Sequence, residues 1–403
     1  GMFEKNREQS RRYYPEAVHY LAMIYAETYR FDLAEQYYRK TLDAYAAPDE
    51  KQSIDYTSAM DNLGNLYNAL GLYEQDVALK EAALGMMRRT EHLENQNFIR
   101  MLTNAASAYS DLFQFEKSEA LLREAERLHE QSPNKDIQNS CHVPFVWGSL
   151  FFKKGAYEQA EEYQSKATEL IRSNFGTDHP YFFTSTQQQA EILLALGQYE
   201  KAASMLLETQ NALLGSMGKN NMDYAKYLGA YSDLLFATGR RDSLPAVLEE
   251  YSATLKRLIR QGAQHLSEHE LAGMYRHFQQ YSNKIFSYTW PGDAMRNTFL
   301  PGTCYDQALF DKGFLLNAGV QLRRLAFEDT TTARMYQGLL QAKRYLSAQY
   351  ARPAAERQQV DELERRIITL EKDLARQAPG FKNAIRDIRW QEVQQQLPPR
   401  SAA

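Results

Sequence analysis

Two pairs of residues have types and spacings that could carry out chemistry. Cys141 and His142 are adjacent, and a thiol beside an imidazole is the combination that thiol enzymes use for nucleophilic attack. Neighbouring residues of a helix point in different directions, so this pair does not form a nucleophile and its base unaided. No third group that would orient the base is evident. The sequence therefore favours a position at a helix start, with a thiol enzyme as the alternative.

His265 and His269 are four residues apart, so a helix would place both on one face, where they could ligate a metal. Structural and catalytic zinc sites use three or four protein ligands, and no third ligand is evident. Two solvated histidines are the simpler interpretation, and a metal-dependent enzyme is the alternative. No glycine-rich phosphate loop, G-x-S-x-G or C-x-x-C motif occurs. We therefore predict no enzyme, catalytic residue, cofactor or metal.

The composition indicates which elements must position any site. Leucine occurs 46 times, whereas valine and isoleucine, which strands prefer, occur 8 and 12 times. Glycine and proline number only 20 and 12 of the 403 residues, and 44% of the residues are hydrophobic. These values exclude collagen and Pro/Gly-rich disorder and predict an all-α protein with a large core.

Charge and hydropathy limit the classes of partner that the chain could bind. Residues 1–308 carry 31 Lys and Arg against 40 Asp and Glu, whereas residues 309–403 carry 16 against 11. The acidic balance of residues 1–308 argues against a nucleic-acid partner, and the absence of any run of 18 apolar residues argues against a membrane. The two cysteines make no disulfide framework. We expect a cytoplasmic protein, or a periplasmic one if a signal peptide preceded Gly1.

A 42-residue period runs through the front of the chain. The phrases GLYEQDVALKEAA, GAYEQAEEYQSKA and GQYEKAASMLLET begin at residues 71, 155 and 197. Aligned on this period, one column holds small residues (Ala22, Gly64, Ala106, Gly148, Ala190, Ser232). Three positions later the residues are large (Tyr25, Tyr67, Tyr109, Phe151, Leu193, Leu235). A small residue lets two helices approach closely, so the columns predict six stacked helical hairpins that turn at Gly71, Gly155, Gly197 and Gly239.

This pattern resembles the tetratricopeptide repeat (TPR), whose signature is W-x2-L-G-x2-Y followed by Ala and Phe. Leu63, Gly64 and Tyr67 match it, as do Trp147 and Gly148. The long period and the linker FGTDHPYF at 175–182 are similar to kinesin-light-chain repeats. The pattern departs from the signature in the second helix of repeat two, at Asp76 and Lys80, and in the sixth turn, at Arg241. The resemblance implies a right-handed α-solenoid over residues 14–262.

The remaining residues predict a different arrangement. Residues 263–328 read as irregular capping helices. Within 329–390, apolar residues are spaced as two heptad seams on either side of Pro353, which predicts an antiparallel coiled-coil hairpin. The two seams are Met335, Leu339, Ala342 and Leu346, then Val360, Leu363, Ile367, Leu370 and Leu374.

The stretch YDQALFDKGFLLN at 305–317 and the phrase around Trp390, Glu392, Val393 and Gln394 are similar to the region that precedes the peptidase domain in CHAT-domain proteins. The resemblance implies that 391–403 is a linker to a C-terminal caspase-like peptidase domain beyond Ala403. That domain holds the catalytic residues of the family, so none is expected here.

In TPR proteins the first helix of each repeat lines the concave face, which implies a groove for a protein or peptide ligand. Asparagine offers donors and an acceptor that can clamp an extended peptide backbone. The alternative is that the polar residues of the first helices are ordinary solvated side chains that bind no ligand. The predicted groove residues are His19, Asp61, Asn62, Asn65, Asn68, Arg100, Asn104, Ser107, Asp111 and Phe152. The predicted function is a peptide-binding sensor or regulatory arm of a CHAT-type peptidase, and the alternative is a stand-alone TPR adaptor.

Overall fold

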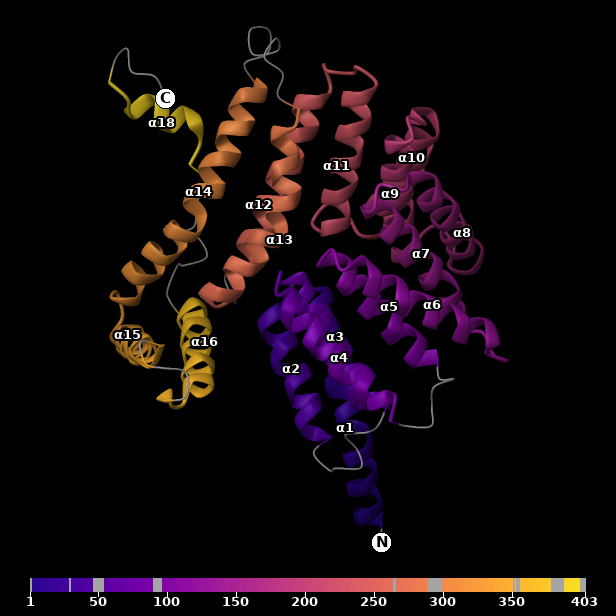
Figure 1. Ribbon diagram of the computed structural model, residues 1–403. Helices are drawn as coiled ribbons and strands as arrows, with labels where there is room; N and C mark the ends of the chain where they lie inside the picture. Colours follow the sequence, from indigo (N-terminus) through magenta and orange to yellow (C-terminus); the bar gives the residue numbers. More distant parts are fainter. Residues whose placement is uncertain are drawn as a thin grey trace. The chain divides into compact units, whose positions relative to one another are not determined.

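The computed structural model describes residues 2–28, 30–45, 54–89, 96–263, 266–288, 299–350, 352, 356–377 and 388–398. These residues form α-helices joined by turns and contain no β-strand, as the composition predicts. The chain divides into two compact units (Figure 1). The first unit holds residues 1–28 and 33–254, and the second holds residues 29–32 and 255–403. No helix in the described part of the chain is long and apolar enough to cross a membrane.

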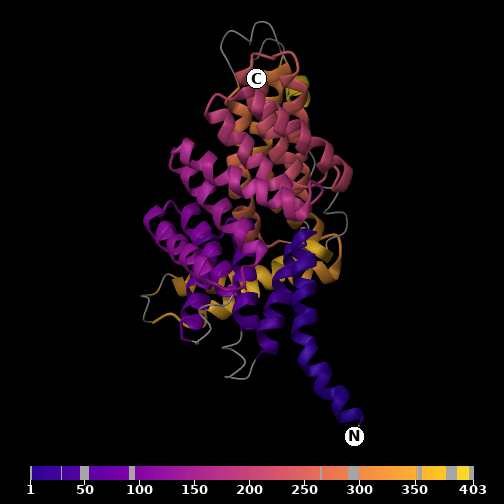
Figure 2. The ribbon, with the colours of Figure 1, turned by 90° about the vertical axis from the view of Figure 1, so that its right-hand side faces the viewer.

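The first unit is a succession of helical hairpins (Figure 2). From α3 to α10 each first helix packs against its own second helix, and α5, α7, α9 and α11 also pack against the second helix of the preceding hairpin. The second helices from α4 to α10 begin at intervals of 42 residues. The helices are α1 (Met2–Glu27), α2 (Phe31–Ala44), α3 (Ile54–Ala69), α4 (Tyr73–Met87), α5 (Gln96–Asp111), α6 (Phe115–Gln131), α7 (Ile137–Lys153), α8 (Tyr157–Phe175), α9 (Pro180–Ala195), α10 (Tyr199–Ser216) and α11 (Met222–Ala237).

The turns inside the second to sixth hairpins each contain a left-handed residue. Gly71, Gly155, Gly197 and Gly239 have φ between 67° and 77°, at the positions where the sequence predicts the turns. The third hairpin places Phe113 at the equivalent position, with φ of 57°. Left-handed backbone is strained for a residue with a Cβ atom, so this turn is strained where the others are not.

The small residues of the repeat lie where two helices touch. A Cβ atom added to Gly64 would lie 2.6 Å from Asp76 Oδ1 of α4, and one added to Gly148 would lie 2.9 Å from Gln164 Oε1 of α8. Trp147 is buried beside this contact. The close approach that the repeat pattern predicts is therefore present in both hairpins.

The second unit begins within α12 (Leu244–Ala263) and continues with α13 (Glu268–Phe286) and α14 (Phe299–Ala326), which pack together. Next, α15 (Thr330–Tyr350) and α16 (Val360–Gln377) pack against each other. Their contact contains Leu339, Ala342, Ile367 and Leu374, so residues of both predicted seams meet.

The last described helix is α18 (Trp390–Gln396), and at its start the Glu392 side chain accepts a hydrogen bond from the Arg389 backbone N–H at 3.2 Å. Within residues 391–403, which the sequence predicts to be a linker, the residues up to Gln396 belong to this short helix. Phe381 and Ile385, which continue the apolar spacing in the sequence, lie outside the described residues.

Candidate functional site

A cavity of about 710 Å³ opens in the first unit. Its wall comes mainly from the first helices of five consecutive hairpins. The residues that line it include His19 of α1, Asn62 and Asn65 of α3, Arg100 and Asn104 of α5, His142 and Phe145 of α7, and Tyr181 and Thr184 of α9. One recess is therefore assembled from side chains that are far apart in the sequence.

Five of the ten predicted groove residues line this cavity: His19, Asn62, Asn65, Arg100 and Asn104. The other five are not among its lining residues. Asp61 is only 3% exposed, so its side chain points into the helix stack and is not available to a ligand. Asn68, Ser107, Asp111 and Phe152 are half-buried at positions outside the cavity.

The cavity asparagines also hold neighbouring repeats together. Asn62 Nδ2 lies 2.9 Å from His19 Nε2, and Asn104 Nδ2 donates to Asp61 Oδ2 at 2.6 Å. Outside the cavity, Asn68 Nδ2 donates to Asp111 Oδ2 at 2.9 Å in the same way. Each bond joins first helices of consecutive hairpins, a role that sequence reasoning missed. The signal for it was the recurrence of a polar residue in one column of successive repeats.

A buried charge cluster lies behind the asparagines of α3. Lys80 and Asp76 form an ion pair on α4, and both side chains are buried. Lys80 Nζ also donates to Asn65 Oδ1 at 2.8 Å. Burial raises the pKa of Asp76 to about 6, although Lys80 opposes the shift, and burial also raises the pKa of Asp61. Asp76 and Lys80, the two residues that depart from the repeat signature, thus form a polar cluster that supports the cavity wall from behind.

The charges around the cavity are of both signs. Arg100 is the one arginine or lysine among the described residues that line it, and arginine stays charged at any physiological pH. Glu16, Glu27 and Asp55 supply negative charge from α1 and α3. Burial, reinforced by the charge of Arg100, lowers the pKa of His142 to about 4. At neutral pH His142 is therefore an uncharged ring that faces the cavity.

The thiol pair shows no activation. Cys141 is buried, and this burial, together with the negative charge of Asp136, raises its pKa to about 11. The thiol therefore stays protonated at neutral pH, whereas a nucleophilic cysteine needs a lowered pKa.

The histidine pair falls largely outside the described part of the chain. His265 is outside the described residues, as is the side chain of His269. Among the residues that are described, no three His, Cys, Asp or Glu side chains are grouped so that they could hold a metal ion.

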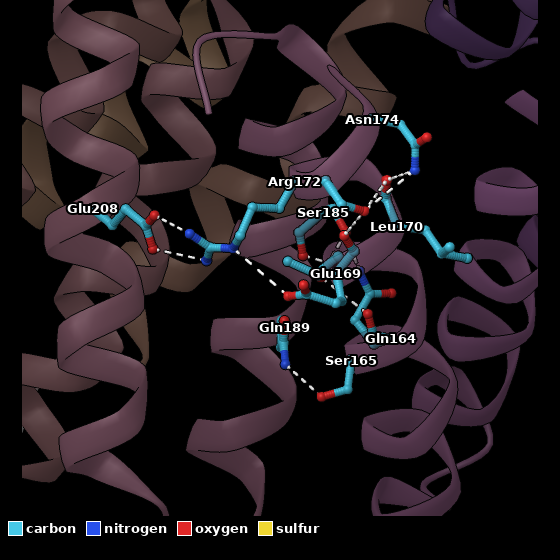
Figure 3. A network of polar contacts seen from close by, with 11 residues as sticks. Gln164, Ser165, Glu169, Leu170, Arg172, Asn174, Ser185, Gln189 and Glu208 are labelled. Carbon is cyan, nitrogen blue, oxygen red and sulfur yellow. Dashed lines mark hydrogen bonds and ion pairs between the residues drawn. The ribbon is translucent and has the colours of Figure 1, made fainter. Parts of the chain in front are cut away.

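The contact between one hairpin and the next is polar around α9 (Figure 3). Gln164 Nε2 of α8 donates to Ser185 Oγ of α9 at 2.8 Å, and Gln189 Nε2 of α9 donates to Ser165 Oγ at 3.0 Å. Arg172 of α8 forms a bidentate ion pair with Glu208 of α10. The side of a first helix that carries Ser185 and Gln189 therefore packs on the preceding hairpin.

The fold and the cavity define a class: a superhelix of helical hairpins whose first helices line a recess. Residues 16–47 and 146–213 match models of the tetratricopeptide repeat. These two stretches therefore carry tetratricopeptide repeats, and the fold of the chain is an all-α TPR superhelix.

Similar proteins come from two comparisons. Intraflagellar transport protein 70A from Homo sapiens is 26% identical over 166 residues, which are 40% of this chain and 23% of the relative. The same protein from Xenopus tropicalis is 28% identical over 168 residues, 40% of this chain and 24% of the relative. The chain thus matches about a quarter of the length of these curated relatives.

Among solved structures, a Rap protein complexed with Competence and Sporulation Factor is similar in fold, with a TM-score of 0.50 and 15% identity. The match covers 68% of this chain and 76% of the Rap chain. A putative kinesin light chain from Podosopora anserina has a TM-score of 0.40 and 16% identity, over 51% of this chain and 96% of the other.

Proposed function

We propose that this chain is a protein-binding TPR scaffold whose cavity holds an extended segment of a partner protein. The observation that carries the proposal is the cavity itself, to which the first helices of five hairpins contribute amide, aromatic and charged side chains. An extended segment crosses such a wall and meets each helix in turn. Its main chain can then bond to the asparagines, because each side-chain amide offers two donor hydrogens and an acceptor oxygen.

The charges define what the segment carries. An acidic group pairs with Arg100, and a basic group lies toward Glu16, Glu27 and Asp55. The neutral ring of His142 and the ring of Phe145 pack against apolar atoms of the segment. A bond to the arginine is charge-assisted and contributes about 1.5–3 kcal/mol, against about 0.5–1.5 kcal/mol for a neutral bond.

A selection of displayed peptides on the whole chain, followed by calorimetry on the selected peptides, tests this function. We expect Arg100→Ala to weaken binding about 10-fold or more. Arg127→Ala is the matched control, because Arg127 is an exposed arginine of α6 outside the cavity. Peptides that bind wild type and Arg100→Ala alike would place recognition elsewhere.

We further propose that the chain is the sensor or regulatory arm of a CHAT-type caspase-like peptidase. The phrase that begins at Trp390 packs on the stretch 305–317: the Trp390 backbone N–H donates to Asp306 Oδ1, and Arg389 Nη1 lies 3.5 Å from Asp306 Oδ2. This contact between the two resembling stretches supports the proposal. Sequencing the gene beyond the codon for Ala403 tests it: a stop codon there would favour the stand-alone adaptor.

A further inference from the structure

The end of the cavity at α7 and α9 is lined by uncharged side chains. They are Cys141, His142 and Phe145 of α7, Ile171 of α8 and Tyr181 of α9, and we call them the α7–α9 subsite. Cys141 and Ile171 are only 3% and 4% exposed, so they form its floor. Burial raises the pKa of the Cys141 thiol to about 11, so the floor stays uncharged at neutral pH. A ligand group that reaches this floor leaves water, which favours an apolar group.

Aromatic rings form the walls of the subsite. The rings of His142 and Phe145 are stacked, with their centroids 6.4 Å apart and 21° between their planes. The centroids of the Phe175 and His179 rings lie 5.8 and 4.7 Å from that of Tyr181, so both rings hold Tyr181 in place. Aromatic side chains offer a large contact area at a low cost in conformational entropy. Packing against neighbouring rings thus positions the walls for an apolar ligand group.

A positive charge borders the subsite. Burial lowers the pKa of His142, and the charge of Arg100 on α5 lowers it further, so Arg100 lies close to this ring. The carboxylates Glu16 and Asp55 line the cavity from α1 and α3. Because α5 packs between α3 and α7, these acidic residues lie on the other side of α5 from the subsite. The order along the cavity is therefore acidic, then basic, then uncharged and aromatic.

We propose that the α7–α9 subsite binds one bulky apolar side chain of the partner segment, close to the acidic residue that pairs with Arg100. The inference rests on the proposed function and adds the class of side chain that anchors the segment. Packed helices are about 8–10 Å apart, and an extended chain rises about 3.3 Å per residue. One step from α5 to α7 therefore corresponds to about two or three residues, which separate the anchor from the acidic residue.

Random displayed peptides that bind the whole chain in an Arg100-dependent way are the probe. Their sequences should share a large apolar residue two or three positions from an acidic one. Calorimetry should show that alanine at this anchor weakens binding about 10-fold or more, because a buried anchor dominates the affinity of such a contact. Tyr181→Ala should weaken the anchored peptide to a similar extent. Tyr199→Ala is the matched control, since Tyr199 is 38% exposed on α10 outside the cavity, and it should bind like wild type.

A variant that fills the subsite gives a second test. Thr184 lines the cavity one helical turn after Tyr181, so Thr184→Phe places a ring in the subsite. It should weaken the anchored peptide about 10-fold but leave binding of the alanine version unchanged, because that version does not use the subsite. Circular dichroism checks the fold. If Thr184→Phe does not fold, the comparison of Tyr181→Ala with Tyr199→Ala decides.

Photo-cross-linking locates the anchor. A selected peptide with benzoylphenylalanine at the anchor position should cross-link to α7, α8 or α9, as identified by mass spectrometry. Arg100-dependent peptides that share no apolar anchor, or whose anchor cross-links to α1 or α3, would overturn this inference and leave the proposed function intact. Equal binding of the anchored peptide by Tyr181→Ala and wild type would overturn it too. Peptides that bind independently of Arg100, or a selection that yields none, would overturn both.

Discussion

Asn104 Nδ2 donates a hydrogen bond to Asp61 Oδ2 over 2.6 Å and so joins α5 to α3. The other carboxylate oxygen of Asp61 is buried and has no hydrogen-bond partner among the described residues. The carboxylate therefore depends on Asn104, together with the nearby charge of Lys80, which favours its ionised form. A residue that lines the cavity is thus also part of the contact between repeats.

Asn104→Ala should lower the free energy of unfolding by about 1–3 kcal/mol, because it leaves a buried carboxylate without a donor. Urea denaturation measures the loss. Asn62→Ala is the control: its partner His19 is only partly buried, so a loss of about 0.5–1.5 kcal/mol is expected. Equal losses in the two variants would contradict the special dependence of Asp61 on Asn104.

Gly64→Ala and Gly148→Ala should each destabilise the fold by about 1–3 kcal/mol, because the added methyl group overpacks the contact inside a hairpin. Thermal or chemical unfolding measures the effect. Gly85→Ala serves as the control, since a Cβ there meets nothing within 4 Å, and alanine in a helix should be neutral or stabilise by up to about 1 kcal/mol. A loss at Gly85 as large as at Gly64 would argue against overpacking.

Phe113→Gly should stabilise the protein by about 1 kcal/mol, because it relieves left-handed strain at an exposed turn. The reverse change at the equivalent turn, Gly155→Ala, should cost about the same amount, since space is free there and strain is the one penalty. The melting temperatures of the two variants should therefore move in opposite directions. Destabilisation by Phe113→Gly would instead indicate that the edge-to-face contact of Phe113 with Phe115 outweighs the strain.

Lys80→Met should lower the free energy of unfolding by about 3–5 kcal/mol, because it leaves Asp76 buried without its cation. The double variant Asp76→Ala with Lys80→Met removes both charges, and its loss should be smaller than that of Lys80→Met alone. A double-mutant cycle by urea denaturation measures the coupling. Strictly additive effects would show that the two side chains do not depend on each other.

The pH dependence of His142 has a definite sign. Its pKa is about 4 in the folded protein, below the ordinary value of 6.5, so the unfolded chain binds this proton more readily. The stability that His142 contributes is present above about pH 6.5 and is lost as the pH falls toward 4. His142→Gln should flatten this part of the stability profile relative to wild type. An imidazole that titrates near 6.5 by NMR would contradict the prediction.

Local features of the chain were readable from the sequence because they depend on short spacings. The hairpins, their left-handed turns at Gly71 and Gly155, and the close contact at Gly64 follow from helix periodicity and from residue size. The apolar contact between α15 and α16 follows from heptad spacing in the same way. The sequence also showed that the second helix of repeat two departs from the pattern at Asp76 and Lys80. It did not show that these two residues form a buried ion pair.

The tertiary structure alone decided which polar residues face the cavity. The sequence by itself determined an all-α solenoid and the column in which Asn62 and Asn104 lie. It could not separate Asn65, which lines the cavity, from Asp61, which is buried. Nor did it indicate that Cys141 and His142 would each stay uncharged at neutral pH. The physical reason is that these properties depend on side chains one repeat away, whose directions are set only when the hairpins stack.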